Sequence, residues 1–199
     1  MHLPSVALWT AAFAGLGLTA GAQDGPPPLP TRDVIVTYRL EDVGGAGREG
    51  KIRLVFTAQS QRVRLDSFGF VEAANPYLSV IYDRPAGSYV TWDYAQRAIF
   101  PREADKMDNP GALLTPTLQY TRQGGGTVAD LACTNWRFAD ATGPSGIACV
   151  TEDGVVLRLV RTSRPTGSME AMAVEYGTPP DALFTPPPDL RMMVRKTPK

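Results

Sequence analysis

The sequence has almost no histidine, few cysteines and no excess of charge. Of its 199 residues the one histidine is His2, and the formal net charge is zero, with 20 basic and 20 acidic residues. Without histidine after that position, Ser-His-Asp and Cys-His nucleophiles and histidine-based metal sites are excluded. The basic residues are scattered singly, so no basic surface for nucleic acid is expected. We therefore expect no cofactor and no nucleic-acid partner.

The N-terminal 22 residues have the pattern of a secretory signal peptide. An apolar run over residues 6–18 is followed by small residues, and Ala20 and Ala22 fit a cleavage site before Gln23. The alternative is a membrane anchor, but the glycines in this run make it short and weak for a span. No later run is long and apolar enough to cross a membrane. We expect cleavage near Ala22, a periplasmic mature chain and no transmembrane span in it.

Proline runs mark both ends of the expected domain. Pro26–Pro28 cannot join a helix or a central strand, which indicates a linker over residues 23–31, and Pro186–Pro188 lie at the far end. Between them, period-two alternation and turn signals repeat and helical periodicity is scarce. We expect a β domain over residues 32–190 and a C-terminal tail over 191–199. Residues 101–116 are the one unclear stretch, with room for a short helix near 104–107.

The fold class predicted is mainly β: a single antiparallel meander of about ten strands, curled into a half-barrel or barrel, with little helix. Several turns predict the register of the hairpins. Across residues 58–61, Leu54 is expected opposite Leu65, Phe56 opposite Val63, and Arg53 opposite Asp66 on the other face. Asp153-Gly154 is a strong two-residue hairpin signal.

The later hairpins have their own expected pairs. Across Asp153-Gly154, Val150 should face Leu157, Ala148 should face Leu159, and Cys149 should face Arg158. Across Arg164–Gly167, Leu159 should face Met172, Leu157 should face Val174, Val155 should face Tyr176, and Arg161 should pair with Glu170. A fold-back centred on Ala141 places Cys133 directly opposite Cys149 on the outer face.

The two cysteines are predicted to form a disulfide. Export would place Cys133 and Cys149 in an oxidising compartment, where such a pair staples a fold. The alternatives are weaker, because a zinc site needs about four ligands and a redox pair normally has C-x-x-C spacing.

One apolar face per strand pair, with little helix to cover it, predicts a trough that binds something hydrophobic or is filled by its own side chains. Residues 101–116 and the proline-rich tail are candidate lids. For each candidate ligand-binding residue the alternative is ordinary core packing. The candidates are Tyr38, Leu54, Phe56, Trp136, Leu157, Leu159, Met172 and Tyr176.

Two motifs resemble a known family. The first is C-x-x-W followed by A-C-V-T-x-D-G, here from Cys133 to Gly154, and the second is Glu175-Tyr176-Gly177 followed by Phe184 and Pro186–Pro188. Together they are similar to an uncharacterised family of secreted bacterial proteins with a LolA/LolB-like, lipoprotein-carrier-like half-barrel. The resemblance implies a curved antiparallel sheet, a periplasmic location and binding of acyl chains or another hydrophobic ligand. The carriers cover their cavity with helices, of which this chain has few.

Three functions are weighed. The first is a non-catalytic periplasmic binding protein for a lipid or other hydrophobic molecule. The second is a structural or protein-interaction module of the cell envelope with a filled core and an envelope protein as partner. The third, an enzyme, would need a carboxylate pair. The carboxylates available are Asp66, Glu72, Asp83, Asp93 and Asp153. Without a histidine or a nucleophile-elbow pattern, we expect no catalysis.

Overall fold

A computed structural model describes residues 25–41, 47–103, 113–114, 118–139, 145–162 and 168–193. The described residues form twelve strands in one sheet and a 3₁₀ helix, η3 (Asp181–Phe184). The strands are β1 (Val34–Leu40), β2 (Gly50–Thr57), β3 (Arg62–Phe68), β4 (Leu78–Asp83), β5 (Ser88–Asp93), β6 (Ala98–Glu103), β7 (Gln119–Val128), β8 (Leu131–Ala139), β9 (Ser145–Val150), β10 (Val156–Arg161), β11 (Met169–Tyr176) and β12 (Arg191–Met192). The predicted fold class, a mainly β curled antiparallel sheet with little helix, is confirmed, and the sheet is open.

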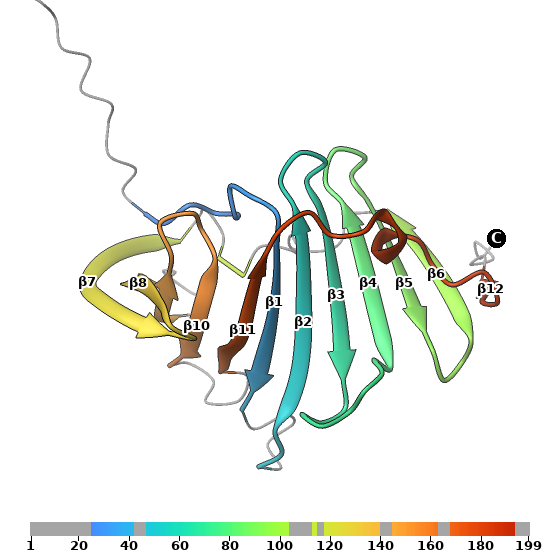
Figure 1. Ribbon diagram of the computed structural model, residues 1–199, viewed down its shortest axis with the longest axis horizontal. Helices are drawn as coiled ribbons and strands as arrows, with labels where there is room; N and C mark the ends of the chain where they lie inside the picture. The colour runs from blue at the N-terminus through green and yellow to red at the C-terminus, as the bar shows by residue number, and fades with distance from the viewer. Residues whose placement is uncertain are drawn as a thin grey trace, which may run out of the picture.

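The strand order shows how the chain builds this sheet. Neighbours run β12-β6-β5-β4-β3-β2-β1-β11-β10-β9-β8-β7, so one meander covers β1 to β6, a second covers β7 to β11, and β1 pairs with β11 to join them. In Figure 1 the two meanders extend to opposite sides of the β1–β11 pair. Because β6 and β7 stand far apart in this order, the connection between them must pass from one side of the sheet to the other.

The two faces of the sheet carry separate buried clusters. The inner face is the one that carries Val34, Val36 and Tyr38 of β1, and its cluster draws side chains from β1 to β3 and from β7 to β11. The outer face is the opposite one, where Val55, Trp92 and neighbouring apolar residues pack under the C-terminal segment. Figure 1 shows that segment, in red, crossing in front of β2 to β5 before it reaches β6. The outer face is thus covered over one meander.

The predicted register of the first meander is confirmed. Leu54 pairs with Leu65, Phe56 pairs with Val63, and Arg53 stands opposite Asp66, as the turn at residues 58–61 predicts. In the β9–β10 hairpin, Ala148 pairs with Leu159 and Cys149 with Arg158, also as predicted. The pair Val150–Leu157 is wrong, because a bulge between Val156 and Arg158 places Val156 opposite Val150.

The predicted register of β10 with β11 is wrong. Leu159 pairs with Met169, three residues before Met172, and Arg158 instead of Arg161 binds Glu170, with 2.6 Å between Nε and Oε2. The β1–β11 ladder has a second irregularity at the step from Thr37 to Tyr38, whose partners are Ala173 and Ala171. Met172 is the extra residue at this bulge, and 40% of its surface is exposed. An extra residue shifts the alternation of the strand by one position.

The disulfide between Cys133 and Cys149 is confirmed, with Cα atoms 5.4 Å apart. The register differs by two residues from the prediction, since Asn135 is the residue opposite Cys149. The sulfurs therefore bridge a diagonal of the β8–β9 ladder. Both cysteines are buried, although the prediction placed them on an open outer face, because Gly126 of β7 approaches Cys149 closely: a Cβ there would lie 3.1 Å from its sulfur.

Removing the disulfide should lower the stability of the fold. Cross-linking a loop of this length stabilises a fold by about 3 kcal/mol, so Cys133→Ala with Cys149→Ala should lower the midpoint of thermal unfolding by about 10 °C. Calorimetry of the native and double-variant proteins measures this, and the native protein in reductant is the matched control. Equal midpoints in all three samples would show that the bond contributes nothing.

Candidate binding site

An apolar cavity lies on the inner face where β10 separates from β11. The ladder between these strands has two residue pairs, Arg158–Glu170 and Leu159–Met169, and does not continue to Val156. The enclosed volume of the cavity is about 20 Å³, and the wider depression, with the open space at its mouth, measures about 290 Å³. Its lining comes from β1, β2, the turn before β10 and two segments outside the sheet: Pro28, Pro30, Val36, Tyr38, Leu54, Leu113, Gly154, Val155 and Val156. We call it the seam cavity.

Tyr38 lines the seam cavity, and its hydroxyl already has a hydrogen-bond acceptor. Its hydroxyl donates a hydrogen bond of 2.7 Å to the carbonyl of Val156, beyond the last β10–β11 pair. Burial raises the pKa of Tyr38 far above its ordinary value, with a smaller contribution from Tyr176, so the hydroxyl stays protonated. The bond bridges the opening between the two meanders and leaves the cavity wall apolar.

Residues 25–33, here named the N-terminal strap, pack over this end of the sheet. Pro26 is buried, and the amide of Thr31 donates to the carbonyl of Asp153 over 2.9 Å. Gly154 has φ +87°, and a Cβ at this position would lie 2.4 Å from the carbonyl oxygen of Leu29. The turn before β10 therefore accepts the strap because glycine stands there. Pro28 and Pro30 of the strap form part of the cavity wall.

Arg32, Asp153 and Tyr176 lock the strap to the sheet. Arg32 Nε donates to Asp153 Oδ2 over 2.6 Å, and the Arg32 guanidinium lies 3.6 Å from the centroid of the Tyr176 ring. Tyr176 donates more weakly to Asp153 Oδ1, at 3.4 Å. Tyr176 belongs to β11 and Asp153 to the turn before β10, so these three residues, the latch, close the seam at the end where the strands separate.

The latch shifts the protonation of its members. Burial acts to raise the pKa of Asp153, but hydrogen bonds from Thr151 and Arg32 outweigh it and hold that pKa below its usual value. The hydrogen bond with Asp153 raises the pKa of Arg32. Burial, followed by the charge of Asp153, raises the pKa of Tyr176. At neutral pH the Asp153 carboxylate of the latch stands between the Arg32 guanidinium and the neutral hydroxyl of Tyr176, and Thr151 donates a further hydrogen bond to it.

The structure divides the eight residues predicted to bind ligand. Tyr38 and Leu54 line the seam cavity. Phe56, Leu157 and Leu159 are buried in the inner-face cluster, with Trp136 and Tyr176 partly buried against it. Met172 stands apart at the β11 bulge, since it is exposed and outside that cluster. Among the described residues, the trough expected from the sequence is thus mostly filled by its own side chains, and the seam cavity is a small space between them.

Several residues of the site escape sequence reasoning. Leu113 and Leu114 fall within the unclear stretch 101–116, and both pack on the inner face, where Leu114 is buried. The rest of the suggested short helix and lid lies outside the described residues. The sequence marks Arg32 only weakly as a site residue, because it is a single cation beside a proline run. Its partner Asp153 is recognisable from the sequence only as a turn residue.

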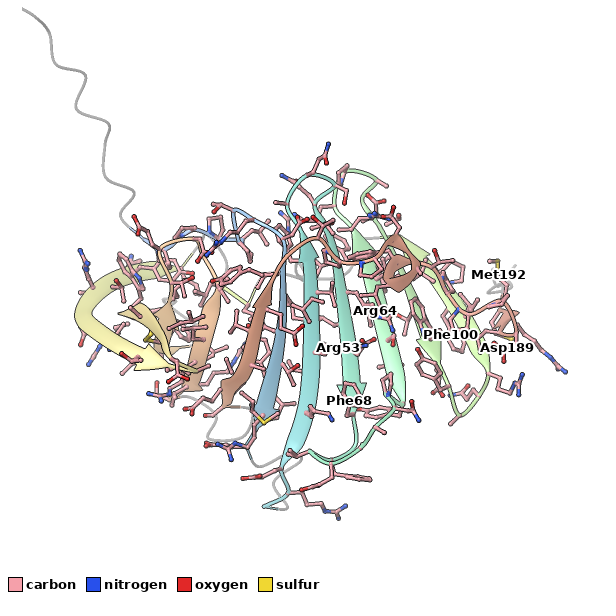
Figure 2. All side chains as sticks on the ribbon, in the orientation of Figure 1. Arg53, Arg64, Phe68, Phe100, Asp189 and Met192 are labelled. Carbon is pink, nitrogen blue, oxygen red and sulfur yellow. A yellow bond between two sulfur atoms is a disulfide. The ribbon has the colours of Figure 1, made fainter. Side chains whose placement is uncertain are left out.

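A second polar cluster occupies the outer face and has no contact with the cavity lining. Asp66 is completely buried and accepts from Arg53 at 2.7 Å, from Arg64 at 2.7 Å and from Ser79 at 2.6 Å. Figure 2 shows Arg53 and Arg64 in the middle of this face. One carboxylate is thus shared by two guanidiniums, which leaves the cluster with one excess positive charge.

The other carboxylates considered for catalysis either close turns or lie exposed in a loop. Asp83 accepts from the amide of Ala86 and Asp93 from that of Gln96, each closing a turn. Glu72 is exposed in the loop after β3. Within the described residues, no group of three or more His, Cys, Asp or Glu side chains is arranged to hold a metal ion. The helical structure in the same part of the chain offers no segment long and apolar enough to cross a bilayer.

Comparison with known proteins shows the fold and no family. No family model matches the chain, and no curated protein matches it. Among solved structures, an uncharacterised conserved protein from Thermus thermophilus is similar at 10% identity and a TM-score of 0.59, over 83% of this chain and 91% of that one. MucB in the MucA/MucB complex of Pseudomonas aeruginosa is similar at 13% identity and a TM-score of 0.50, over 76% of this chain and 54% of that one. This chain thus spans about half the length of MucB.

The neighbours also include the superfamily that the sequence resembles. A LolA superfamily protein from Nitrosomonas europaea matches at 8% identity and a TM-score of 0.39, over 83% of this chain and 94% of that one. The curved, open antiparallel sheet that the resemblance implies is the sheet that the structure shows. The two sequence motifs meet in space, because Asp153 of the first accepts a hydrogen bond from Tyr176 of the second, and Gly154 lies against Leu29 of the strap.

The latch should weaken in acid. Because the pKa of Asp153 is lowered by folding, its contribution to stability is complete above the ordinary carboxyl pKa of about 4 and is lost as pH falls through the lower, folded value. The protection factor of the Thr31 amide against hydrogen exchange should therefore be lower at about pH 2.5 than at about pH 5, two values on either side of the ordinary carboxyl pKa.

Asp153→Asn should show low protection of Thr31 at both pH values, with little further change in acid. Asp181→Asn, which alters an exposed ion pair elsewhere, is the matched control and should behave as the native protein. A native protection factor that stays constant in acid would show that Asp153 does not hold the strap.

Proposed function

We propose that this protein is a non-catalytic binding protein of the periplasm that holds the apolar part of a lipid or other hydrophobic ligand in the seam cavity. The observation that carries the proposal is a cavity with an apolar wall whose one nearby hydroxyl, that of Tyr38, already has an acceptor. An alkyl or aryl group that enters such an apolar site gains by leaving water.

The size of the cavity limits the ligand. Small-molecule sites usually enclose about 300–1,000 Å³, whereas the enclosed volume of the seam cavity is about 20 Å³, room for about one water molecule. Even a short acyl chain therefore enters only if the N-terminal strap or Leu113 moves away. Tyr38 and Leu54 would contact the ligand directly, with Trp136 and Tyr176 at the margins. Phe56, Leu157 and Leu159 would support the wall from behind.

Export agrees with this function. The disulfide is of the kind that persists in oxidising compartments. The proposed signal peptide, residues 1–22, lies outside the described residues, and the proposed binding domain spans residues 32–190. Cleavage near Ala22 would leave the strap near the new N-terminus, a few residues from the cavity it covers.

Protein binding is the second candidate. MucB, which shares this fold, has been solved in complex with MucA. The observation in this chain that favours a protein partner is on the outer face, where a segment of extended polypeptide already lies across the sheet.

Changing the side chain at Leu113 should tune ligand binding. Leu113→Trp fills the seam cavity and should lower the affinity for medium-chain fatty acids at least about tenfold, while Leu113→Ala enlarges it and should keep or raise that affinity. Leu113 is only partly buried and lies outside the strands, so both variants should fold.

Titration calorimetry of the delipidated protein with octanoate, decanoate and palmitate measures the effect. Ile147→Trp is the matched control, because Ile147 is an exposed apolar residue of β9 on the outer face. Equal affinities for both Leu113 variants would remove the seam cavity as the site. No binding of any fatty acid by the native protein would remove the proposed ligand class.

A further inference from the structure

Residues 178–193, here named the C-terminal strap, lie on the outer face as an extended segment. The strap leaves β11 after Gly177, forms η3 over β3, and ends as β12, which adds to β6 as a parallel strand. Arg191 donates its amide to the carbonyl of Arg97 at 2.9 Å, and Met193 donates to that of Ile99 at 2.8 Å. Figure 2 shows Asp189 and Met192 at this edge of the sheet. The strap thus binds the sheet as an added strand does.

The sheet recognises this segment mainly with arginines. Arg62 Nη2 donates to Asp181 at 3.0 Å and its guanidinium lies 4.6 Å from the centroid of the Phe184 ring. Arg64 donates to the carbonyl of Leu183, and Arg97 to the carboxylate of Asp189 at 2.7 Å. The hydrogen bonds from these arginines go to acidic side chains and to a backbone carbonyl of the strap.

These contacts hold the strap only loosely. Asp181 is 94% exposed, and Arg97 and Asp189 are both more than half exposed, so these ion pairs contribute little free energy in water. Phe184, which is buried, is the main apolar anchor, with partly buried Leu183 and Leu190 beside it. A competing segment therefore has few strong contacts to replace.

The face beneath the strap carries a hydrogen-bond donor and a positive charge that the strap does not match. Trp92 is completely buried in the same cluster as Phe184, yet its indole Nε1 has no acceptor within the part of the chain that the structure describes. Arg64 lies 5.3 Å from the centroid of the Trp92 ring and shares Asp66 with Arg53, so the cluster keeps one excess positive charge. A buried donor without an acceptor costs free energy, which an incoming carbonyl or carboxylate would recover.

We propose that the outer face of β3 to β6 is a docking surface for an acidic, extended peptide of another protein, and that the C-terminal strap occupies this surface until such a peptide displaces it. The peptide has the chemistry that the strap displays: a carboxylate three residues before an aromatic side chain, then a second carboxylate, then a short strand that pairs with β6. The surface is separate from the seam cavity and does not depend on the hydrophobic ligand.

The covalent connection explains why the strap occupies its own site by default. A tethered segment competes at an effective concentration in the millimolar range, so a free peptide must be tighter or more abundant to displace it. Weakening the tethered copy without altering the receiving side chains should therefore increase the apparent affinity for a free peptide. This is the signature that distinguishes a docking surface from a purely structural cover.

The experiment uses the full chain and a fluorescein-labelled peptide with the sequence of residues 178–193, with binding followed by fluorescence anisotropy. Asp181→Arg should raise the apparent affinity for the peptide up to about fivefold, and Phe184→Ala on the order of tenfold. Asp181 is almost fully exposed, so the first variant should fold even if the second does not. Glu170→Lys, which breaks the exposed Arg158–Glu170 pair outside the strap, is the matched control and should leave the affinity unchanged.

A charge exchange tests the receiving side. Arg62→Glu should abolish binding of the peptide, and a peptide carrying Arg at the position of Asp181 should bind this variant again. A scrambled peptide should not bind any of the proteins.

Two results would overturn the proposal. One is an affinity that does not change in Asp181→Arg and in a folded Phe184→Ala, because the strap would then not compete. The other is a dimer of the native chain, seen by light scattering, that the free peptide dissociates. That result would assign the surface to the strap of a second copy instead of a separate protein.

Discussion

The pairing of β1 with β11 is the constraint on which the rest of this structure depends. It joins the two meanders into one sheet and places β6 and β7 far apart in it. The connection between β6 and β7 must then cross the sheet, and the described part of it, Leu113 and Leu114, packs on the inner face. The same pairing brings the segments that flank β1 and β11 to one end of the sheet, from which each runs over a different face.

The seam cavity follows from this arrangement. β1 pairs along its whole length with β2 and, across one bulge, with β11, but β10 pairs with β11 over two residue pairs and then separates. The backbone groups near the opening need other partners, and Tyr38 supplies one by reaching to Val156. The latch then closes the far end of the seam. The cavity is therefore a consequence of where the second meander leaves the first.

Local signals in the sequence were sufficient for much of the fold. The turn at residues 58–61 fixed the register of β2 with β3, and the Asp153-Gly154 turn fixed most of β9 with β10. The sequence of β11, Met-Glu-Ala-Met-Ala-Val, is apolar at nearly every position, so alternation does not reveal a bulge within it. This is why Met172 was predicted on the inner face, while Val174 and Tyr176, which follow the bulge, do pack against the inner-face cluster. The β1–β11 pairing, the Tyr38–Val156 bond at the seam and the strap contacts join residues more than about 90 positions apart, which turn chemistry cannot predict.

The proline runs acquire a physical role from the same constraint. A sheet with two apolar faces needs cover on both, and this chain has little helix to provide it. Proline-rich segments cannot join a sheet interior, yet they lose little conformational entropy when they lie extended across one. Each strap is held by an arginine-to-aspartate contact near a turn or edge and by apolar packing beneath it. Each strap is a single extended segment held at few points. Displacing it should therefore cost less free energy than displacing a packed helix would. The proposed binding of an apolar group on one side and a polypeptide on the other would use these two thin covers on a single sheet.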